Sequence, residues 1–279
     1  MTLKFMAGKS LLIMIALATL CLNVTAQTYK QQRIQVASFN IISSGITGAV
    51  GTLIHKKSSE TKGHALLRGF AKGSLSGLVI LAGKEITGYA RVAQRYDYIL
   101  CGKLTHAVGA SMLENTATNE KLFYNLGIDF GPVRFDTKRG VRFQPFASGC
   151  LVAIAMLSRG FNLRLTLLSG TPIFNYKPKP GFNALTLANS FSFDNKAYVN
   201  TGKYNNKYNV ISHEIIHTFQ YRESQAITHM IGFNKSKHIY WDVPFNFINW
   251  YIGDLSNKEY YGNYYEMEAH LIASGEQVK

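Results

Sequence analysis

The sequence predicts an α+β fold, because the spacing of its hydrophobic residues changes twice along the chain. Residues 27–119 are rich in glycine and have the pattern of packed helices. Residues 121–200 alternate between apolar and polar positions, as strands do, and residues 204–279 return to a helical pattern. We therefore expect Gly-rich packed helices (27–119), followed by a region (120–279) that combines helices with a small antiparallel sheet. Residues 27–279 can equally form one compact domain.

Residues 1–26 have the features of a secretory signal peptide. Lys4 and Lys9 form a basic N-terminal region. The apolar run that follows, Ser10–Leu22, is too short to span a bilayer comfortably. The small residues of Val24-Thr25-Ala26 predict cleavage before Gln27. We therefore expect a secreted protein, or one of the periplasm or cell envelope. An uncleaved N-terminal anchor is the alternative.

Two glycine patterns predict helices that approach each other closely. Ile41–Ile54 carries glycines at three-residue spacing, and Gly73 and Gly77 form a small-xxx-small pair within Phe70–Gly83. Such glycines usually let two helix backbones come together. A packed helix pair is one interpretation. A membrane-inserted hairpin that uses the uncharged stretch Val36–Ile54 is the other.

The middle of the chain carries a β-hairpin pattern. Val133–Asp136 and Val141–Gln144 alternate with period two and are joined by a polar turn that contains Gly140. Further short strands are expected at Asn162–Leu167, Ile173–Tyr176, Ala184–Ala188 and Ser190–Phe193. Further helices are expected at Leu104–Leu113, around residues 208–219 and at Glu266–Ala273.

The net charge limits the kinds of partner that the protein can bind, and the cysteine content limits its possible disulfides. The formal net charge of +14 falls to +12 when the two lysines of the leader are removed, and the cations are spread along the chain without a nucleic-acid-binding motif. We therefore expect no nucleic acid as a partner, and an anionic envelope or membrane surface as a possible one. Cys101 and Cys150 remain after cleavage, and they form either a disulfide or two free thiols.

Residues 213–217 read His-Glu-Ile-Ile-His, which is the most informative motif of the chain. On a helix, residues i and i+4 lie on one face, so His213 and His217 can bind one Zn²⁺. Glu214 then stands where a carboxylate can take a proton from a metal-bound water. No Gly or Pro interrupts Asn205–Ile231, so the flanks are compatible with a helix. The motif predicts metal-assisted hydrolysis, usually of a peptide bond.

A catalytic zinc needs a third protein ligand and one open position. Forty-nine residues after His217, residues 265–270 read Tyr-Glu-Met-Glu-Ala-His. With these two motifs, residues 205–279 resemble the gluzincin branch of the zincin metallopeptidases. The N-terminal two-thirds resemble secreted bacterial proteins with a Gly-rich start and a late HExxH. The gluzincin resemblance implies zincin-like active-site helices, zinc held by His213, His217 and Glu266, and Glu214 as the general base.

Three neighbours of Glu266 decide how well this resemblance fits. Glu268 competes with Glu266 for the place of the third ligand. Only one of the two can face the metal, because residues two apart on a helix point in widely separated directions. Ala269 favours Glu266, since the family has a small residue at that position where the two helices approach. His270 stands where the family usually has an Asp that supports a ligand imidazole. This departure puts the support of that imidazole in doubt.

The resemblance implies a secreted zinc metallopeptidase that hydrolyses peptide or protein substrates. The oxyanion that forms needs a stabilising group, and the sequence offers His229, His238, Tyr240 and Tyr264 without choosing among them. Ala184–Phe193 can supply an edge strand that holds an extended substrate. The alternative is a non-catalytic or membrane-associated envelope protein that keeps a zinc-binding helix pair.

Overall fold

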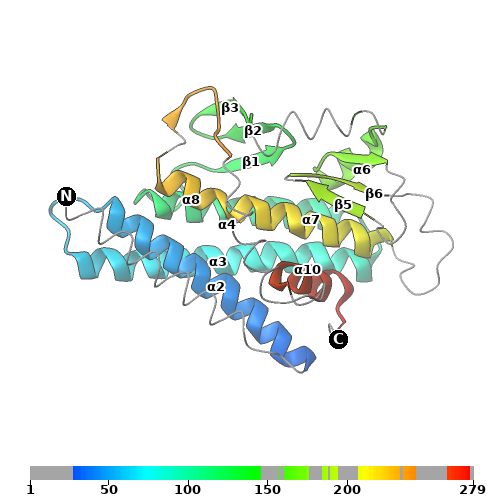
Figure 1. The fold of residues 1–279 in the computed structure, drawn as a ribbon, viewed down its shortest axis with the longest axis horizontal. Helices are drawn as coiled ribbons and strands as arrows, with labels where there is room; N and C mark the ends of the chain where they lie inside the picture. The colour runs from blue at the N-terminus through cyan, green and yellow to red at the C-terminus, as the bar shows by residue number, and fades with distance from the viewer. Residues whose placement is uncertain are drawn as a thin grey trace.

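The computed structural model describes residues 28–145, 157, 160–175, 184–187, 189–193, 207–232, 235–242 and 263–276. The expected signal peptide, Cys150 and part of the aromatic segment after Tyr240 lie outside these residues. Cys101 is exposed and unpaired within the described part of the chain. The predicted α+β class is confirmed, because helices pack beside two small sheets (Figure 1).

Three long helices form the base of the structure. They are α2 (Tyr29–Ile54), α3 (Lys62–Ala93) and α4 (Asp97–Ala117), each longer than the sequence pattern indicated. Thr28 begins α2 with a capping box, and Thr61 begins α3 by accepting a hydrogen bond from the His64 amide. Figure 1 shows both sheets on the same side of these helices, above α4 and α7.

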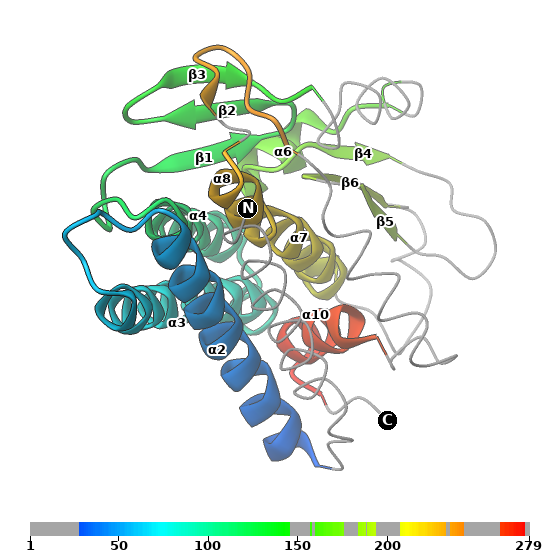
Figure 2. The same ribbon diagram turned by 60° about the vertical axis from the view of Figure 1, so that its left-hand side comes forward.

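Glycines set the distance between α2 and α3, as the sequence predicts. A Cβ atom added at Gly73 would collide with the carbonyl oxygen of Ser44, and one at Gly77 would collide with that of Asn40. The two backbones therefore touch where the helices cross, which only residues without a Cβ atom permit. The crossing is visible in Figure 2.

The predicted hairpin is confirmed and has an additional strand. The first sheet has the order β1-β2-β3 and is antiparallel throughout, with Val133 opposite Phe143. Its strands are β1 (Gly127–Phe130), β2 (Val133–Asp136) and β3 (Gly140–Phe143). The second sheet has the order β4-β6-β5, with β4 parallel and β5 antiparallel to β6. Its strands are β4 (Ile173–Asn175), β5 (Ala184–Leu187) and β6 (Ser190–Phe193).

One predicted strand is wrong. Asn162–Leu167 was expected to be extended, but Leu163–Ser169 forms the helix α6. The Asn162 side chain caps this helix by accepting a hydrogen bond from the Leu165 amide at 3.1 Å, and Gly170 ends it in the left-handed conformation. Local capping therefore overrides the alternating pattern.

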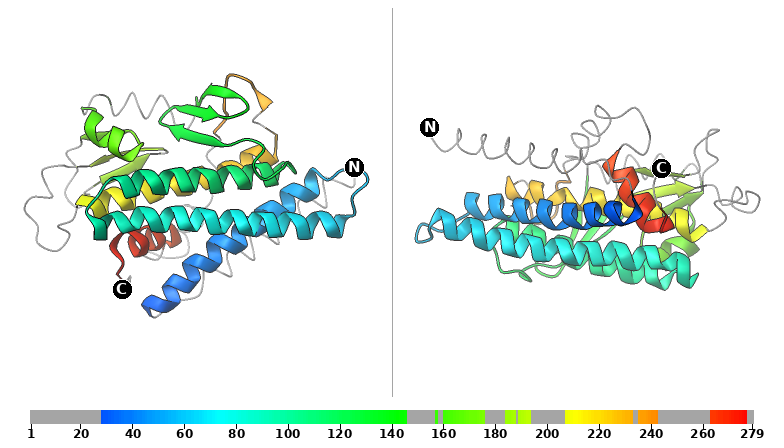
Figure 3. Two further views of the ribbon diagram at one scale, coloured as in Figure 1. Left: turned by 180° about the vertical axis from the view of Figure 1, so that it is seen from behind. Right: turned by 90° about the horizontal axis from the view of Figure 1, so that it is seen from below.

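The C-terminal helices pack against the Gly-rich ones. They are α7 (Lys207–Glu223), α8 (Gln225–Met230) and α10 (Tyr264–Ser274). Lys84 of α3 forms a fully buried ion pair with Glu268 of α10 at 2.9 Å. The Ser212 hydroxyl of α7 donates to the carbonyl oxygen of Thr87. The Gly-rich helices and the C-terminal helices therefore share a buried interface, and the left-hand view of Figure 3 shows α10 beside α3.

Helices α2 and α3 are long and apolar enough to cross a membrane by length and composition, and a third of the apolar window of each is buried in the structure. Core helices of soluble proteins and signal sequences meet the same criterion.

Candidate metal centre

Helix α7 presents the two motif histidines because its other side is anchored in the core. Ile211, Ile215 and Phe219 are buried in a cluster with residues of α3, α4 and the second sheet. The buried stripe has the spacing of one helix face, so the helix cannot rotate without exposing it. His213 and His217 consequently lie together on another face, each with a side chain 16% exposed.

Helix α10 brings Glu266 to these histidines. Asn263 caps the helix by accepting a hydrogen bond from the Tyr265 amide at 2.9 Å. Ala269 is fully buried in a cluster that includes Ile216 of α7. This small side chain lies in the contact between α7 and α10, as the gluzincin resemblance implies, and Glu266 occupies the first turn of α10.

The three ligand atoms converge to the spacing of a metal site. The Nε2 atoms of His213 and His217 lie 3.0 Å apart, and the Glu266 Oε2 atom lies 3.3 Å from each of them. In a tetrahedral site with metal–ligand bonds of about 2.0–2.1 Å, neighbouring ligand atoms lie about 3.3 Å apart. One point can therefore lie at bonding distance from all three atoms, and no other group of this kind occurs among the described residues.

The Glu266 carboxylate fits a cation. Its Oε2 atom is buried and takes part in no hydrogen bond within the described chain. Burial raises the pKa of this carboxyl, but His213 and His217 lower it well below its ordinary value. Burial likewise lowers the pKa of His217, and the opposing effect of Glu266 raises it to about 9. A positive charge is thus stabilised at the point where the three side chains meet.

Gln220 orients the second histidine, a role that the sequence analysis did not assign. The Gln220 Nε2 group donates to the Glu268 carboxylate at 2.8 Å and to the Tyr265 carbonyl at 3.0 Å. The amide oxygen must therefore face His217, whose Nδ1 atom lies 2.8 Å away. An acceptor at Nδ1 places the imidazole proton there and leaves the Nε2 lone pair for a metal. The i, i+3 spacing of His217 and Gln220 was the available signal.

Glu268 faces away from the three ligand atoms. Both of its carboxylate oxygens accept hydrogen bonds from the buried Lys84 ammonium at 2.9 Å, and one also accepts from Asn40 at 2.6 Å. Lys84 also pairs with Glu223, which bonds to His106. We call Lys84, Glu223, Glu268 and His106 the lysine cluster. Glu268 therefore completes an ion pair, and Glu266 is the carboxylate on the histidine side.

Glu214 and His270 lie close to the histidines. The Thr186 hydroxyl of β5 donates to the Glu214 carboxylate at 2.5 Å, so the second sheet contacts the motif directly. The charge of Glu214 contributes to the raised pKa of His217. Burial lowers the pKa of His270, and the charge of His213 lowers it further. His270 lies one turn after Glu266 on the same helix.

Two of the four candidates for oxyanion stabilisation, His229 and Tyr240, belong to a separate buried cluster. His229 and Tyr240 bond each other at 3.1 Å, and Tyr240 donates to Glu114 of α4. Glu114 also pairs with Arg134 at 2.7 Å and with Arg222. We call Glu114, Arg134, Arg222, His229 and Tyr240 the arginine cluster.

The two remaining candidates also have other surroundings. The Tyr264 hydroxyl donates to Glu268 at 3.4 Å, and burial raises the pKa of that hydroxyl well above its ordinary value. His238 is exposed, and its carbonyl oxygen accepts a hydrogen bond from the Phe143 amide. None of these contacts assigns an oxyanion-stabilising role.

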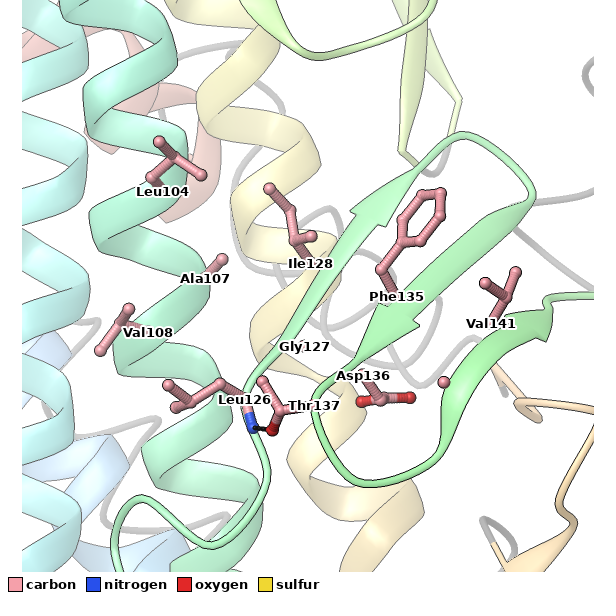
Figure 4. Close-up of a pocket in the computed structure, with 11 residues that line it drawn as sticks. Leu104, Ala107, Val108, Leu126, Gly127, Ile128, Phe135, Asp136, Thr137 and Val141 are labelled. Atoms are coloured by element: carbon pink, nitrogen blue, oxygen red, sulfur yellow. Dashed lines mark hydrogen bonds between the residues drawn. The ribbon is translucent and has the colours of Figure 1, made fainter.

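A groove of about 390 Å³ lies between α4 and the first sheet, lined mainly by apolar side chains such as Leu104, Ile128 and Phe135 (Figure 4). Asp136 is the ionisable residue of its lining, and both Arg134 and Arg142 bind that carboxylate. The groove therefore offers no unpaired catalytic group.

Comparison with known proteins found no family model, no curated protein and no solved structure that matches this chain.

Proposed function

We propose that the protein is a secreted or envelope-resident zinc metallopeptidase of gluzincin type. The observation that carries this proposal is the convergence of His213 Nε2, His217 Nε2 and Glu266 Oε2, with Glu214 next to His213 on helix α7. Two imidazoles and one carboxylate are the ligand set of catalytic zinc sites that keep one position open. Zinc, when bound, supplies a Lewis acid that polarises a carbonyl and makes water acidic near neutral pH.

Each residue of the centre has a defined task in this proposal. Glu214 accepts a proton from the attacking water and returns it to the leaving amine. Thr186 holds one oxygen of the Glu214 carboxylate by its hydroxyl, so the carboxylate keeps one orientation. Gln220 fixes the tautomer of His217. These tasks need only small movements, because α7 and α10 are held by buried residues on their other faces.

The second sheet supports a peptide as the substrate. β5 lies at one end of the strand order β4-β6-β5 and contacts α7 through Thr186. A strand at a sheet edge can bind an extended peptide through backbone hydrogen bonds. We therefore propose that the substrate chain lies along β5, across the Glu214 side of α7.

The test combines metal analysis with a peptide-library digest. We expect the purified protein to contain one zinc ion and to cleave peptides. Glu214→Gln should keep the zinc and lose hydrolysis, whereas Glu266→Gln should lose the zinc as well. Zinc with no cleavage by the unaltered protein would support the non-catalytic envelope protein instead. Iron in place of zinc would indicate oxygenase chemistry, which uses the same ligand types, and would overturn the proposal.

The proposed location rests on residues 1–26, which lie outside the described part of the chain. Expression in a bacterium followed by N-terminal sequencing of the exported protein tests it. A start at Gln27 supports the secretory assignment, and retention of Met1 in a membrane fraction supports the uncleaved anchor.

A further inference from the structure

The outward face of α3 is apolar along most of its length. Leu67, Leu75, Leu78, Tyr89 and Val92 are 71%, 46%, 48%, 50% and 58% exposed. Ala82 is also exposed and lies between them in the same helical register. We call Leu67, Leu75, Leu78, Ala82, Tyr89 and Val92 the α3 stripe. Single exposed apolar residues are ordinary, but a row of them along one helix indicates an interaction surface.

The stripe is outward because the other sides of α3 are occupied. Gly77 lies against Asn40 of α2, and Gly83 lies against the backbone of His106 in α4. Gly88 lies against Ile272 of α10. The right-hand view of Figure 3 shows α3 along one edge of the helix layer. On the solvent side of such a helix, polar residues are the usual choice, and α3 has apolar ones instead.

The surroundings of the stripe are basic and aromatic. The Lys and Arg residues of α3 are Lys62, Arg68, Lys72, Lys84 and Arg91, and all of these except Lys84 are at least partly exposed. Glu85 is the only acidic residue of α3, and Arg33 neutralises it at 2.8 Å. At the C-terminal end of the stripe, the rings of Tyr89 and Tyr98 lie 5.0 Å apart, with the Arg95 guanidinium 5.7 Å from the Tyr98 ring. Tyrosine rings beside cations are typical of the boundary between lipid and water.

We propose that the α3 stripe rests on an anionic lipid surface, with α3 parallel to the plane of the membrane. An apolar helix face inserts among the headgroups, and the surrounding cations are attracted to anionic lipid. This inference is independent of zinc and of hydrolysis.

Two alternatives fit the same face less well. A membrane-spanning α3 would carry the buried Lys84 and Glu268 ion pair, and with it α10, into the hydrocarbon. A second copy of this chain would bring two proteins together that each carry a formal charge of about +12 after loss of the leader, and their mutual repulsion opposes this.

The test measures binding to lipid vesicles by co-sedimentation. The protein is purified after export, so that the apolar run of the leader does not itself bind lipid. The probes are vesicles of phosphatidylcholine alone and vesicles with one-third phosphatidylglycerol. We expect binding to the anionic vesicles, weakened by added salt. Leu75→Gln with Leu78→Gln should weaken it at least about tenfold, because both exposed side chains lose apolar contact.

Ile34→Gln with Ile42→Gln is the matched control, since it makes the same chemical change at two exposed positions of α2. This control should bind as the unaltered protein does. No binding to anionic vesicles, or equal loss in both double variants, would overturn the proposal. A dimer in sedimentation velocity that Leu75→Gln with Leu78→Gln dissolves would assign the stripe to a contact between copies instead.

Discussion

Helix α7 contributes to two clusters that each surround a carboxylate, one of them buried and the other partly exposed. In the arginine cluster, Glu114 is paired with two guanidinium groups and accepts a hydrogen bond from Tyr240. In the candidate metal centre, Glu266 lies 3.3 Å from two imidazoles and forms no ion pair with arginine or lysine among the described residues, where its Oε2 atom also has no hydrogen bond. The first cluster contains its own cations, Arg134 and Arg222. In the second, the side chains converge on a point where a metal cation could bind. This difference separates a structural ion pair from a candidate metal site on the same helix.

Arg134→Met should have the largest effect, because it leaves Glu114 and Asp136 with one fewer cation in the interior. We expect a loss of about 3–5 kcal/mol in the free energy of unfolding. Urea denaturation measures it with and without zinc, and the loss should be equal in both. Lys138→Met, at an exposed position of the turn between β2 and β3, is the control and should change little. A fully stable Arg134→Met variant would contradict the structural role of the arginine cluster.

Acidification should reveal the contrast between the buried His106 and the partly exposed His217. Burial lowers the pKa of His106 to about 4, whereas Glu266 raises that of His217 to about 9 despite burial. His106 is neutral in the folded protein, so its unfolded form binds a proton first. Its contribution is therefore full above pH ~6.5 and is lost as the pH falls toward 4, by about 3 kcal/mol in total. Thermal melts from pH 8 to pH 4 measure this loss, and His106→Gln should lack that part of it. An unchanged pH profile in the variant would show that His106 is not the group responsible.

Gln220→Ala should weaken zinc binding without removing a ligand. The His217 ring loses its hydrogen-bond acceptor, and such outer partners typically contribute a factor of about 10–100 to metal affinity. Competition with a chromophoric chelator gives the affinity, and the visible spectrum of the cobalt form reports any change in ligand geometry. Gln225→Ala, a buried glutamine of α8, is the comparison for general effects of losing a buried amide. Equal zinc affinity in Gln220→Ala would leave the orientation of His217 to other contacts.

Thr186→Val should have the smallest effect and should act on hydrolysis alone. The Glu214 carboxylate loses one hydrogen bond but remains in place, so kcat should fall by about tenfold or less. Zinc affinity should not change, because Thr186 contacts none of the three ligands. Thr186→Ser keeps the hydroxyl and should restore the rate. A lowered zinc affinity in Thr186→Val would mean that β5 positions the ligands as well as the base.

The sequence predicted the local parts of this structure better than its long-range contacts. The helix at residues 207–223 and the hairpin at 133–143 follow from patterns that lie within a few residues. Asn162–Leu167 misled because an alternating pattern in a short segment cannot reveal that Asn162 caps a helix. Strand β1 was missed because its four residues alternate too briefly to stand out.

The candidate site shows the same division. His213 and His217 were predicted as ligands from their spacing, and Glu266 from the resemblance to gluzincins. The structure brings the three side chains together. The role of Gln220 depends on Glu268, and that of Glu268 depends on Lys84, which lies 184 residues earlier in the chain. No local pattern encodes such a chain of contacts, because each step joins a different pair of helices.

The close contact of Gly77 with Asn40 makes the Gly-rich helices and the HExxH helix depend on each other. Asn40 accepts a hydrogen bond from Lys84 and donates one to Glu268, which in turn binds Gln220 beside His217. The distance between α2 and α3 therefore helps to set the position of Gln220 beside the candidate metal centre. A chimaera that combines this Gly-rich half with an HExxH half whose contacts to α2 and α3 differ should fold with a misplaced glutamine at the position of Gln220. The two halves can therefore be replaced only as a matched pair.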